Sequence, residues 1–386
     1  MKKILISAAV MALAFSCVYP YEPTLDEKDL SHIVVIEGNV IVGGQSSVRF
    51  SQVLPITNDY EQWYGSFRDI AGMAFIEDEQ GKVYMPVQPR GTTFTFNTQD
   101  ASPDLKYRLR AEIANDVYVS DWMEPIAPPV IEDVSFSCDN TNVLVAVTLE
   151  GGEESSGFVG ISYDENWEFH ADFACEYLLD TLTWDLIDVV KSGQEYPNYW
   201  CWQKASMNGM ILLDISEMQG GRAVEAPLFQ FPRTNSRNHR KYCVTLHART
   251  LPKEAYRYLK NMDDITKSGR SLFTPNPGDM ASNISCESNP DRRVLGYVNV
   301  MRETSFRGWM DDRFKKDRTP YYGEFFLPPG KLAFQSNYYS GNYPVAELTL
   351  PDPETGNPVT GIYWAPRRCI DCVLEGGTKN KPDFWE

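Results

Sequence analysis

The sequence predicts a mainly β protein, in which an N-terminal immunoglobulin-like β-sandwich is followed by a larger β-rich domain with one or a few helices. Three observations support this fold class. Phe, Trp and Tyr make up 13% of the 386 residues, which is typical of β-rich proteins. Gly and Pro are frequent, with 26 and 25 copies, and divide the chain into short segments. Most of these segments have the length of a strand and alternate apolar with polar residues.

We expect the first sandwich within residues 31–127. Strand-length runs follow one another there and are separated by polar turns that contain Gly, Asn or Asp. About seven strands in roughly a hundred residues are typical of an immunoglobulin-like or fibronectin-like module. The expected strands are His32–Val42, Ser47–Leu54, Gly72–Ile76, Val83–Val87, Thr93–Phe96, Leu105–Ile113 and Val117–Met123.

Residues 128–386 are expected to form the larger β-rich domain. The segment PIAPP at residues 125–129 marks the boundary, because proline cannot continue a paired strand. A single helix is predicted over residues 251–268, where apolar residues recur at helical spacing and Gly269 follows as a C-cap. The expected strands are Val130–Phe136, Val143–Leu149, Phe158–Tyr163, Trp167–Tyr177, Met210–Ile215, Leu228–Phe231, Tyr242–Ala248 and, after a long loop, Val294–Met301.

The N-terminus has the pattern of an export signal. Lys2 and Lys3 precede a short apolar run, Ile4–Phe15, which is too short to span a bilayer and is typical of a secretory leader. Cys17 stands at the expected cleavage point, so the sequence predicts a bacterial lipoprotein whose leader, residues 1–16, is removed and whose thiol carries acyl chains. An ordinary signal peptide with an incidental cysteine is the alternative. The polar, acidic residues 17–30 are then a tether.

Composition limits the partners of the chain. The formal net charge is -17, and a body this acidic is repelled by nucleic acid and by anionic headgroups. We therefore expect no nucleic-acid partner and a membrane contact only through the lipid anchor, with the periplasmic and cell-surface faces both open. The four histidines argue against a His-rich metal site, and we expect neither metal nor cofactor.

Cysteines are the candidates for disulfides, because export implies an oxidising compartment. Cys369 and Cys372 form a C-x-x-C motif, CIDC. Zinc would need a second cysteine pair or nearby histidines, and redox catalysis would need the motif at a helix start. A structural disulfide, between these two residues or with distant partners, is the favoured interpretation. The candidate disulfide cysteines are Cys201, Cys286, Cys369 and Cys372.

No catalytic motif is found: G-x-S-x-G, a Gly-rich phosphate loop and H-E-x-x-H are all absent from the sequence. We therefore expect that the protein is not an enzyme. Two clusters are candidate ligand or partner contacts, one in the basic segment 233–249 and one of aromatic residues. Their members are Arg233, Arg237 and Arg240, and Trp200, Trp202, Tyr338 and Tyr339. A polar hairpin loop and ordinary core packing are the respective alternatives.

Several segments resemble a known family. They are the opening CVYPYEPTLDEKDLSHIVVIEGNV, the helix segment LPKEAYRYL, the strand VLGYVNV (Val294–Val300) with the preceding LFTPNPGDMASNISCESNP, and the closing CIDC…KPDFW. In this order they resemble the Bacteroidetes lipoprotein family of domain of unknown function 4249. The resemblance implies an exported lipoprotein, often encoded beside a TonB-dependent outer-membrane receptor, without a known catalytic site. Of functional positions, it implies only Cys17, as the lipid attachment site.

These observations lead to three hypotheses of function. The first is a non-enzymatic outer-membrane lipoprotein that handles a ligand as the accessory partner of a TonB-dependent receptor in nutrient uptake. The second is an adhesin or surface-structural lipoprotein, and the third is a hydrolase with an unrecognised site. The sequence does not reveal the ligand.

Overall fold

The computed structural model describes residues 33–52, 72–88, 92–152, 157–189, 191, 198–268, 282–315, 325–327, 329–352 and 355–385. The leader, Cys17 and the tether lie outside the described residues, so the predicted lipid attachment stays a prediction. Neither of the two α-helices found in the described ranges is long and apolar enough to cross a membrane.

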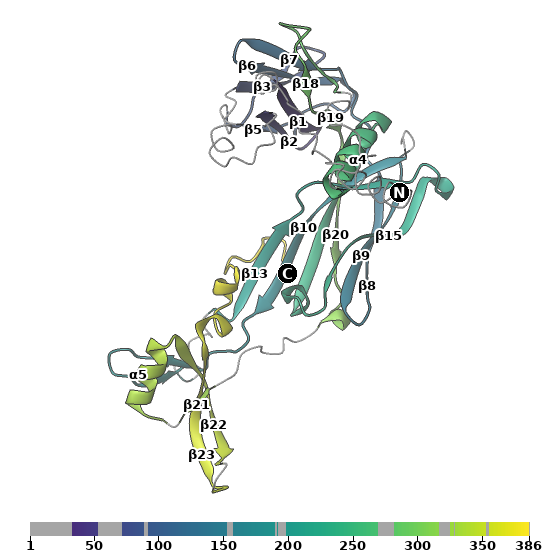
Figure 1. The fold of residues 1–386 in the computed structure, drawn as a ribbon. Helices are drawn as coiled ribbons and strands as arrows, with labels where there is room; N and C mark the ends of the chain where they lie inside the picture. Colours follow the sequence, from purple (N-terminus) through teal and green to yellow (C-terminus); the bar gives the residue numbers. More distant parts are fainter. Residues whose placement is uncertain are drawn as a thin grey trace, which may run out of the picture.

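The fold is mainly β, as the sequence predicts, with strands β1–β23 and helices α4 and α5 in the described residues. Figure 1 shows an elongated arrangement of three units. The first sandwich lies at one end, the second sandwich lies in the middle, and a small third unit lies at the opposite end.

The first sandwich consists of two sheets with the strand orders β18-β1-β2-β5, with β19 also on β1, and β17-β7-β6-β3-β4. Large side chains fill the space between the sheets, and Phe50, Phe94, Tyr107 and Tyr118 are buried there. The strands from the N-terminal part are β1 (Val34–Ile41), β2 (Gln45–Gln52), β3 (Gly72–Asp78), β4 (Val83–Tyr84), β5 (Thr93–Asn97), β6 (Tyr107–Ile113) and β7 (Asp116–Ser120).

Three further strands of this sandwich come from a distant part of the chain. They are β17 (Ile284–Cys286), which pairs with β7, and β18 (Val294–Leu295) and β19 (Val298–Met301), which run parallel to β1. Gly296 connects the last two with φ +101°, and a Cβ atom there would lie 2.0 Å from the Ile36 carbonyl oxygen. Only glycine allows this close approach. The VLGYVNV segment therefore closes the edge of the sandwich that the sequence places within residues 31–127.

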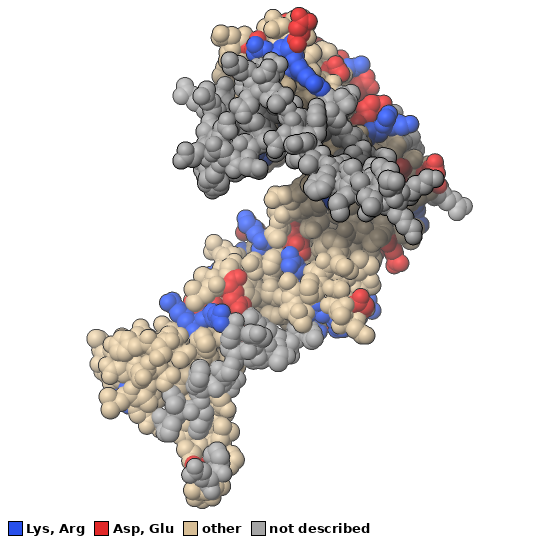
Figure 2. Space-filling view, viewed as in Figure 1, with Lys and Arg blue, Asp and Glu red and all other residues tan. Residues whose placement is uncertain are grey.

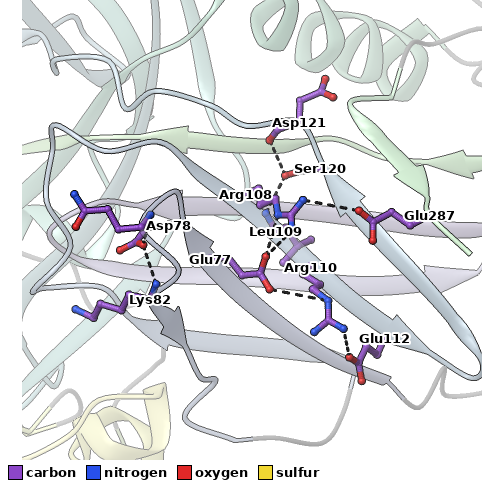
Figure 3. A network of polar contacts seen from close by, with 11 residues as sticks. Glu77, Asp78, Lys82, Arg108, Leu109, Arg110, Glu112, Ser120, Asp121 and Glu287 are labelled. Carbon is purple, nitrogen blue, oxygen red and sulfur yellow. Dashed lines mark hydrogen bonds and ion pairs between the residues drawn. The ribbon is translucent and has the colours of Figure 1, made fainter.

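The outer face of the β17-β7-β6-β3-β4 sheet carries alternating charges on neighbouring strands (Figure 3). Arg108 lies 2.9 Å from Glu77 and 3.9 Å from Glu287, and Arg110 lies 2.7 Å from Glu112. The Arg108–Glu77 pair joins neighbouring strands, whereas Arg110 and Glu112 both lie on β6; such pairs support a sheet modestly. They also keep this face hydrated, so that the core of the sandwich lies only between its sheets.

The second sandwich has one three-stranded sheet, β15-β9-β8, and one larger sheet, β13-β10-β16-β20, with β14 also on β10. Its strands are β8 (Val130–Cys138), β9 (Asn142–Glu150), β10 (Phe158–His170), β13 (Trp200–Ser206), β14 (Ile211–Asp214), β15 (Arg222–Pro232), β16 (Lys241–Thr250) and β20 (Glu303–Trp309). Strand β10 joins the two predicted strands Phe158–Tyr163 and Trp167–Tyr177 into one and ends at His170. The polar residues between them, 164–166, pair with β13 and β16, and the side chains of Asp164 and Glu165 are bonded to His247 and Arg237.

Glu165 is the clearest of these paired side chains, since its carboxylate is buried inside the second sandwich. Arg237 donates to both of its oxygens, at 2.7 and 2.8 Å, and the Tyr242 hydroxyl donates to Oε1 at 2.8 Å. Burial, together with the carboxylate, raises the pKa of Tyr242 well above its usual value, so the phenol keeps its proton. A buried charge persists only when it is paired and hydrogen-bonded in this way.

The predicted helix is α4 (Lys253–Ser268), which begins two residues later than the predicted range 251–268. Ala255, Tyr256 and Tyr258 are its buried residues. The Tyr256 ring stacks on Phe158 of the second sandwich at 4.5 Å, whereas the Tyr258 ring contacts Tyr297 at 5.2 Å. The helix therefore packs at the junction of the two sandwiches (Figure 1).

The third unit combines a hairpin inserted between β10 and β13 with a later part of the chain. The hairpin is β11 (Tyr177–Leu179) and β12 (Leu186–Asp188), and the later part supplies β21 (Phe325–Leu327), α5 (Lys331–Tyr339), β22 (Asn342–Pro351) and β23 (Pro358–Pro366). Phe334 and Trp364 pack against Leu179 and Leu186 and join the two parts. Figure 2 shows that the visible face of this unit is largely uncharged, whereas charged side chains gather over the second sandwich.

A disulfide joins Cys201 on β13 to Cys372 in the 3-10 helix η6 (Cys372–Glu375). The CIDC motif thus supplies a structural disulfide, as predicted, with a partner 171 residues away. The other two candidates do not belong to this bridge. Cys286 lies buried in the first sandwich, with its Sγ 3.3 Å from Ser288 Oγ, and Cys369 lies buried in the third unit. Because they are in different units, they cannot pair with each other.

The C-terminal residues return to the second sandwich. Thr378 exchanges backbone hydrogen bonds with Trp202 on β13, both at 2.8 Å. The Trp385 ring lies against Trp309 at 4.9 Å, and its Nε1 donates to Glu168 at 3.3 Å. The closing KPDFW motif therefore fastens the end of the chain to the outer face of the β13-β10-β16-β20 sheet.

Candidate ligand-binding pocket

A cavity of about 440 Å³ lies in the third unit, between the β11–β12 hairpin and the segment that follows β23. Its volume is within the range that holds drug-sized ligands. Its lining is mainly aromatic and aliphatic, with a few polar groups. The lining residues are Tyr177, Tyr338 and Tyr343; Leu178, Leu179, Ile187 and Ile370; and Cys175, Thr181, Asn198, Arg367 and Asp371.

Backbone hydrogen bonds hold the hairpin that forms one wall of the cavity. Glu176 N donates to Val345 O on β22 at 2.8 Å. The Cys175 Sγ lies 2.9 Å from Tyr177 O and 3.1 Å from Pro344 O, so its one proton is within reach of both carbonyl oxygens. Burial raises the pKa of Cys175 to about 11, so this thiol remains protonated and is not a nucleophile at neutral pH.

Tyrosines from α5 and β22 also line the cavity. The Tyr338 ring lies 5.4 Å from Tyr343 and 5.9 Å from Trp184, in edge-on contacts. Burial raises the pKa of Tyr343 and of Tyr177, so both phenols stay neutral and keep a donor and an acceptor. Such walls offer ring faces together with a few hydrogen-bonding groups.

One ion pair, between Arg367 and Asp371, lies in the lining of the cavity. Arg367 Nε is 3.8 Å from Asp371 Oδ2, and the guanidinium lies 5.9 Å from the centre of the Tyr343 ring. Asp371 is buried and fixed, because its other oxygen accepts a hydrogen bond from Val373 N at 3.1 Å and caps η6. Arg367 is largely exposed. Asp371 is the single carboxylate of the described lining.

The predicted aromatic contacts separate into two places. Tyr338 lines the cavity, and Tyr339 lies beside it with 71% of its surface exposed. Trp200 lies at the edge of the second sandwich, where Arg240 covers its ring at 4.2 Å. Trp202 is paired with the C-terminal segment through its backbone. The sequence could not separate these places, because the spacing of aromatic residues does not show which strand they lie on.

The three predicted arginines do not converge on one site. Arg233 donates to the Asp139 carbonyl at 3.3 Å. Arg237 is held by Glu165 inside the second sandwich, and Arg240 lies 3.3 Å from Glu168. Each guanidinium therefore has its own partner. Arg367, which does line the cavity, was missed by the sequence reasoning; the arginine pair directly before CIDC was its only signal.

His247 forms a second polar cluster, on the outer face of the β13-β10-β16-β20 sheet. Its Nδ1 lies 3.0 Å from Glu303 and its Nε2 lies 3.0 Å from Asp164. The hydrogen bond to Glu303 raises the pKa of His247 against the effect of burial. Burial opposes the ionisation of Glu303, but the bonds to His247 and Arg249 outweigh it and lower its pKa. No group of three metal-ligating side chains occurs in the described part of the chain.

Comparisons with known proteins give a family but no activity. No curated protein matches the chain. Among solved structures, a segment of two fibronectin type III domains from chicken tenascin matches 55% of this chain and 88% of its own length, with 10% sequence identity and a TM-score of 0.15. The family model for a domain of unknown function, DUF4249, matches residues 18–307, which include the first sandwich, the β11–β12 hairpin and the second sandwich up to Arg307 in β20. The chain therefore belongs to the DUF4249 family.

Proposed function

We propose that the protein is a non-enzymatic, lipid-anchored protein of the bacterial outer membrane, which binds a small ligand as the accessory partner of a TonB-dependent receptor. The cavity in the third unit is the observation that carries this proposal. It offers binding surface, and its one thiol is held protonated. The export signal and the position of Cys17 support the anchor.

Labelling with a palmitate analogue tests the anchor. The native protein and a Cys138→Ser control should be labelled and pellet with the membranes. A Cys17→Ala variant should be unlabelled and soluble. Labelling of the Cys17→Ala variant to the same extent as the native protein would contradict the proposal.

Affinity purification from native membranes tests the partner. A tagged protein should recover a TonB-dependent receptor, and the Cys17→Ala variant should recover less of it. Protease treatment of intact cells then decides between the periplasmic and cell-surface faces. If repeated purifications recover no receptor, the proposed accessory role is wrong.

An adhesin or surface-structural role is the second candidate, and the elongated arrangement of the three units favours it (Figure 1). It predicts that the purified protein binds host-matrix or surface polymers and recovers no receptor. The two purifications therefore separate the candidates.

A further inference from the structure

We propose that the cavity of the third unit takes a small anionic amphiphile, which is a flat aromatic or fused-ring body that carries one carboxylate or sulfonate. This inference rests on the proposed function, since it names the ligand class of the same site. Two features of the lining carry it: the chemistry of the walls and the position of one cation.

The walls select the body of the ligand. Leu178, Leu179 and Ile187 come from the β11–β12 hairpin, and Tyr338 and Tyr343 come from α5 and β22. The two tyrosine rings meet at 66°, with their centres 5.4 Å apart. A flat ring can stack on one of them while its edge meets the other, which are the two favourable geometries for aromatic pairs. A fully polar ligand of the same size would leave this apolar surface unused.

Arg367 selects the charge of the ligand. It is the cation of the described lining, and its distance of 3.8 Å to Asp371 is too long for a hydrogen bond. The planar guanidinium has five N–H donors and matches a carboxylate or sulfonate. A ligand anion therefore meets donors that the Asp371 contact does not satisfy.

Asp371 limits the affinity for an anion. Its carboxylate is fixed by Val373 N and faces Arg367, so it offsets part of the cationic charge. Replacement by asparagine keeps a side-chain oxygen for the cap and removes the negative charge. The variant Asp371→Asn should thus bind an anion more tightly, whereas Arg367→Gln should bind it more weakly.

Two fluorescent probes of one shape test the proposal: 1-anilinonaphthalene-8-sulfonate and its uncharged counterpart N-phenyl-1-naphthylamine. The assay uses the full chain with the substitution Cys17→Ser, so that no acyl chain competes with the probes for the cavity. The sulfonate should bind with a stoichiometry of one. Arg367→Gln should weaken binding of the sulfonate by about tenfold, as expected for a charge-assisted hydrogen bond. It should change the affinity for the uncharged probe less than twofold. Asp371→Asn should tighten the sulfonate by about two- to fivefold.

Matched variants locate the binding. Arg368→Gln changes the neighbouring arginine outside the lining and should leave both probes unchanged. Tyr338→Ala should weaken both probes. Leu332→Ala tests the exposed apolar surface, where this side chain is 83% exposed, and should have no effect.

Three results would overturn the inference. They are equal binding of the sulfonate by Arg367→Gln and the native protein, loss of both probes in Leu332→Ala, and weaker sulfonate binding in Asp371→Asn. Near-ultraviolet circular dichroism verifies that each variant is folded. The assay uses no membrane and no receptor. The proposed ligand class can therefore be wrong while the proposed anchor and receptor partner are right, and the anchor and partner can be wrong while the ligand class is right.

Discussion

Removal of the disulfide between Cys201 and Cys372 should loosen the attachment of the third unit to the second sandwich. The bridge spans 171 residues. Closing a loop of that length lowers the entropy of the unfolded chain and stabilises the folded protein by at most about 5 kcal/mol at 25 °C. The C-terminal segment, through Trp385, holds the same region independently. We therefore expect the double variant Cys201→Ala/Cys372→Ala to lose about 2–4 kcal/mol of its free energy of unfolding.

Urea unfolding followed by tryptophan fluorescence measures this effect, because Trp200 and Trp202 flank Cys201. The double variant should unfold at a lower urea concentration than the native protein, and limited proteolysis should release the third unit first. The control Cys138→Ser replaces an exposed cysteine outside the bridge and should change stability by less than about 0.5 kcal/mol. An unchanged midpoint in the double variant, measured on oxidised protein, would refute the reasoning.

Three further predictions concern the sandwiches. Arg237→Met leaves the Glu165 carboxylate buried without its partner and should cost about 3–5 kcal/mol in urea unfolding; the additional change Glu165→Gln should recover part of this loss. Gly296→Ala should destabilise the first sandwich by more than about 2 kcal/mol, because its backbone is left-handed and a Cβ would collide with β1; an unaltered melting temperature would show that the strand can shift. The pKa of His247 is raised on folding, so its contribution to stability is complete below pH 6.5 and is lost as the pH rises through the folded pKa. Melting temperatures between pH 5 and 8.5 should show this loss in the native protein and not in His247→Gln. The pKa of Glu303 is lowered on folding, so its contribution to stability is present above pH 4.5 and is lost as the pH falls through the folded pKa.

Local patterns predicted many elements of this chain because burial on a sheet imposes a period of two. The strands β2, β5 and β6 alternate between buried and more exposed residues and lie close to their predicted ranges. The helix α4 was found from its apolar spacing and the glycine after it. Long strands with polar centres were harder, since the Asp164–Asn166 segment of β10 looks like a turn until its partners on other strands are known.

The candidate site was less accessible to sequence reasoning. Tyr338 was found because aromatic residues are conspicuous, but Arg367 and Tyr177 were missed. These residues lie 190 positions apart in the chain and meet only because the β11–β12 hairpin packs beside the segment after β23.

The printed sequence was sufficient for the mainly β class, the acidic charge and a disulfide at the CIDC motif, and it predicts an export signal at residues 1–16. These properties depend on local composition and spacing. The tertiary structure alone decided that residues 284–301 complete the first sandwich, that Cys372 pairs with Cys201, and that a cavity lies in the third unit. Each of these depends on which distant segments share an edge or a core, and that choice is made by packing and hydrogen bonding across the whole chain.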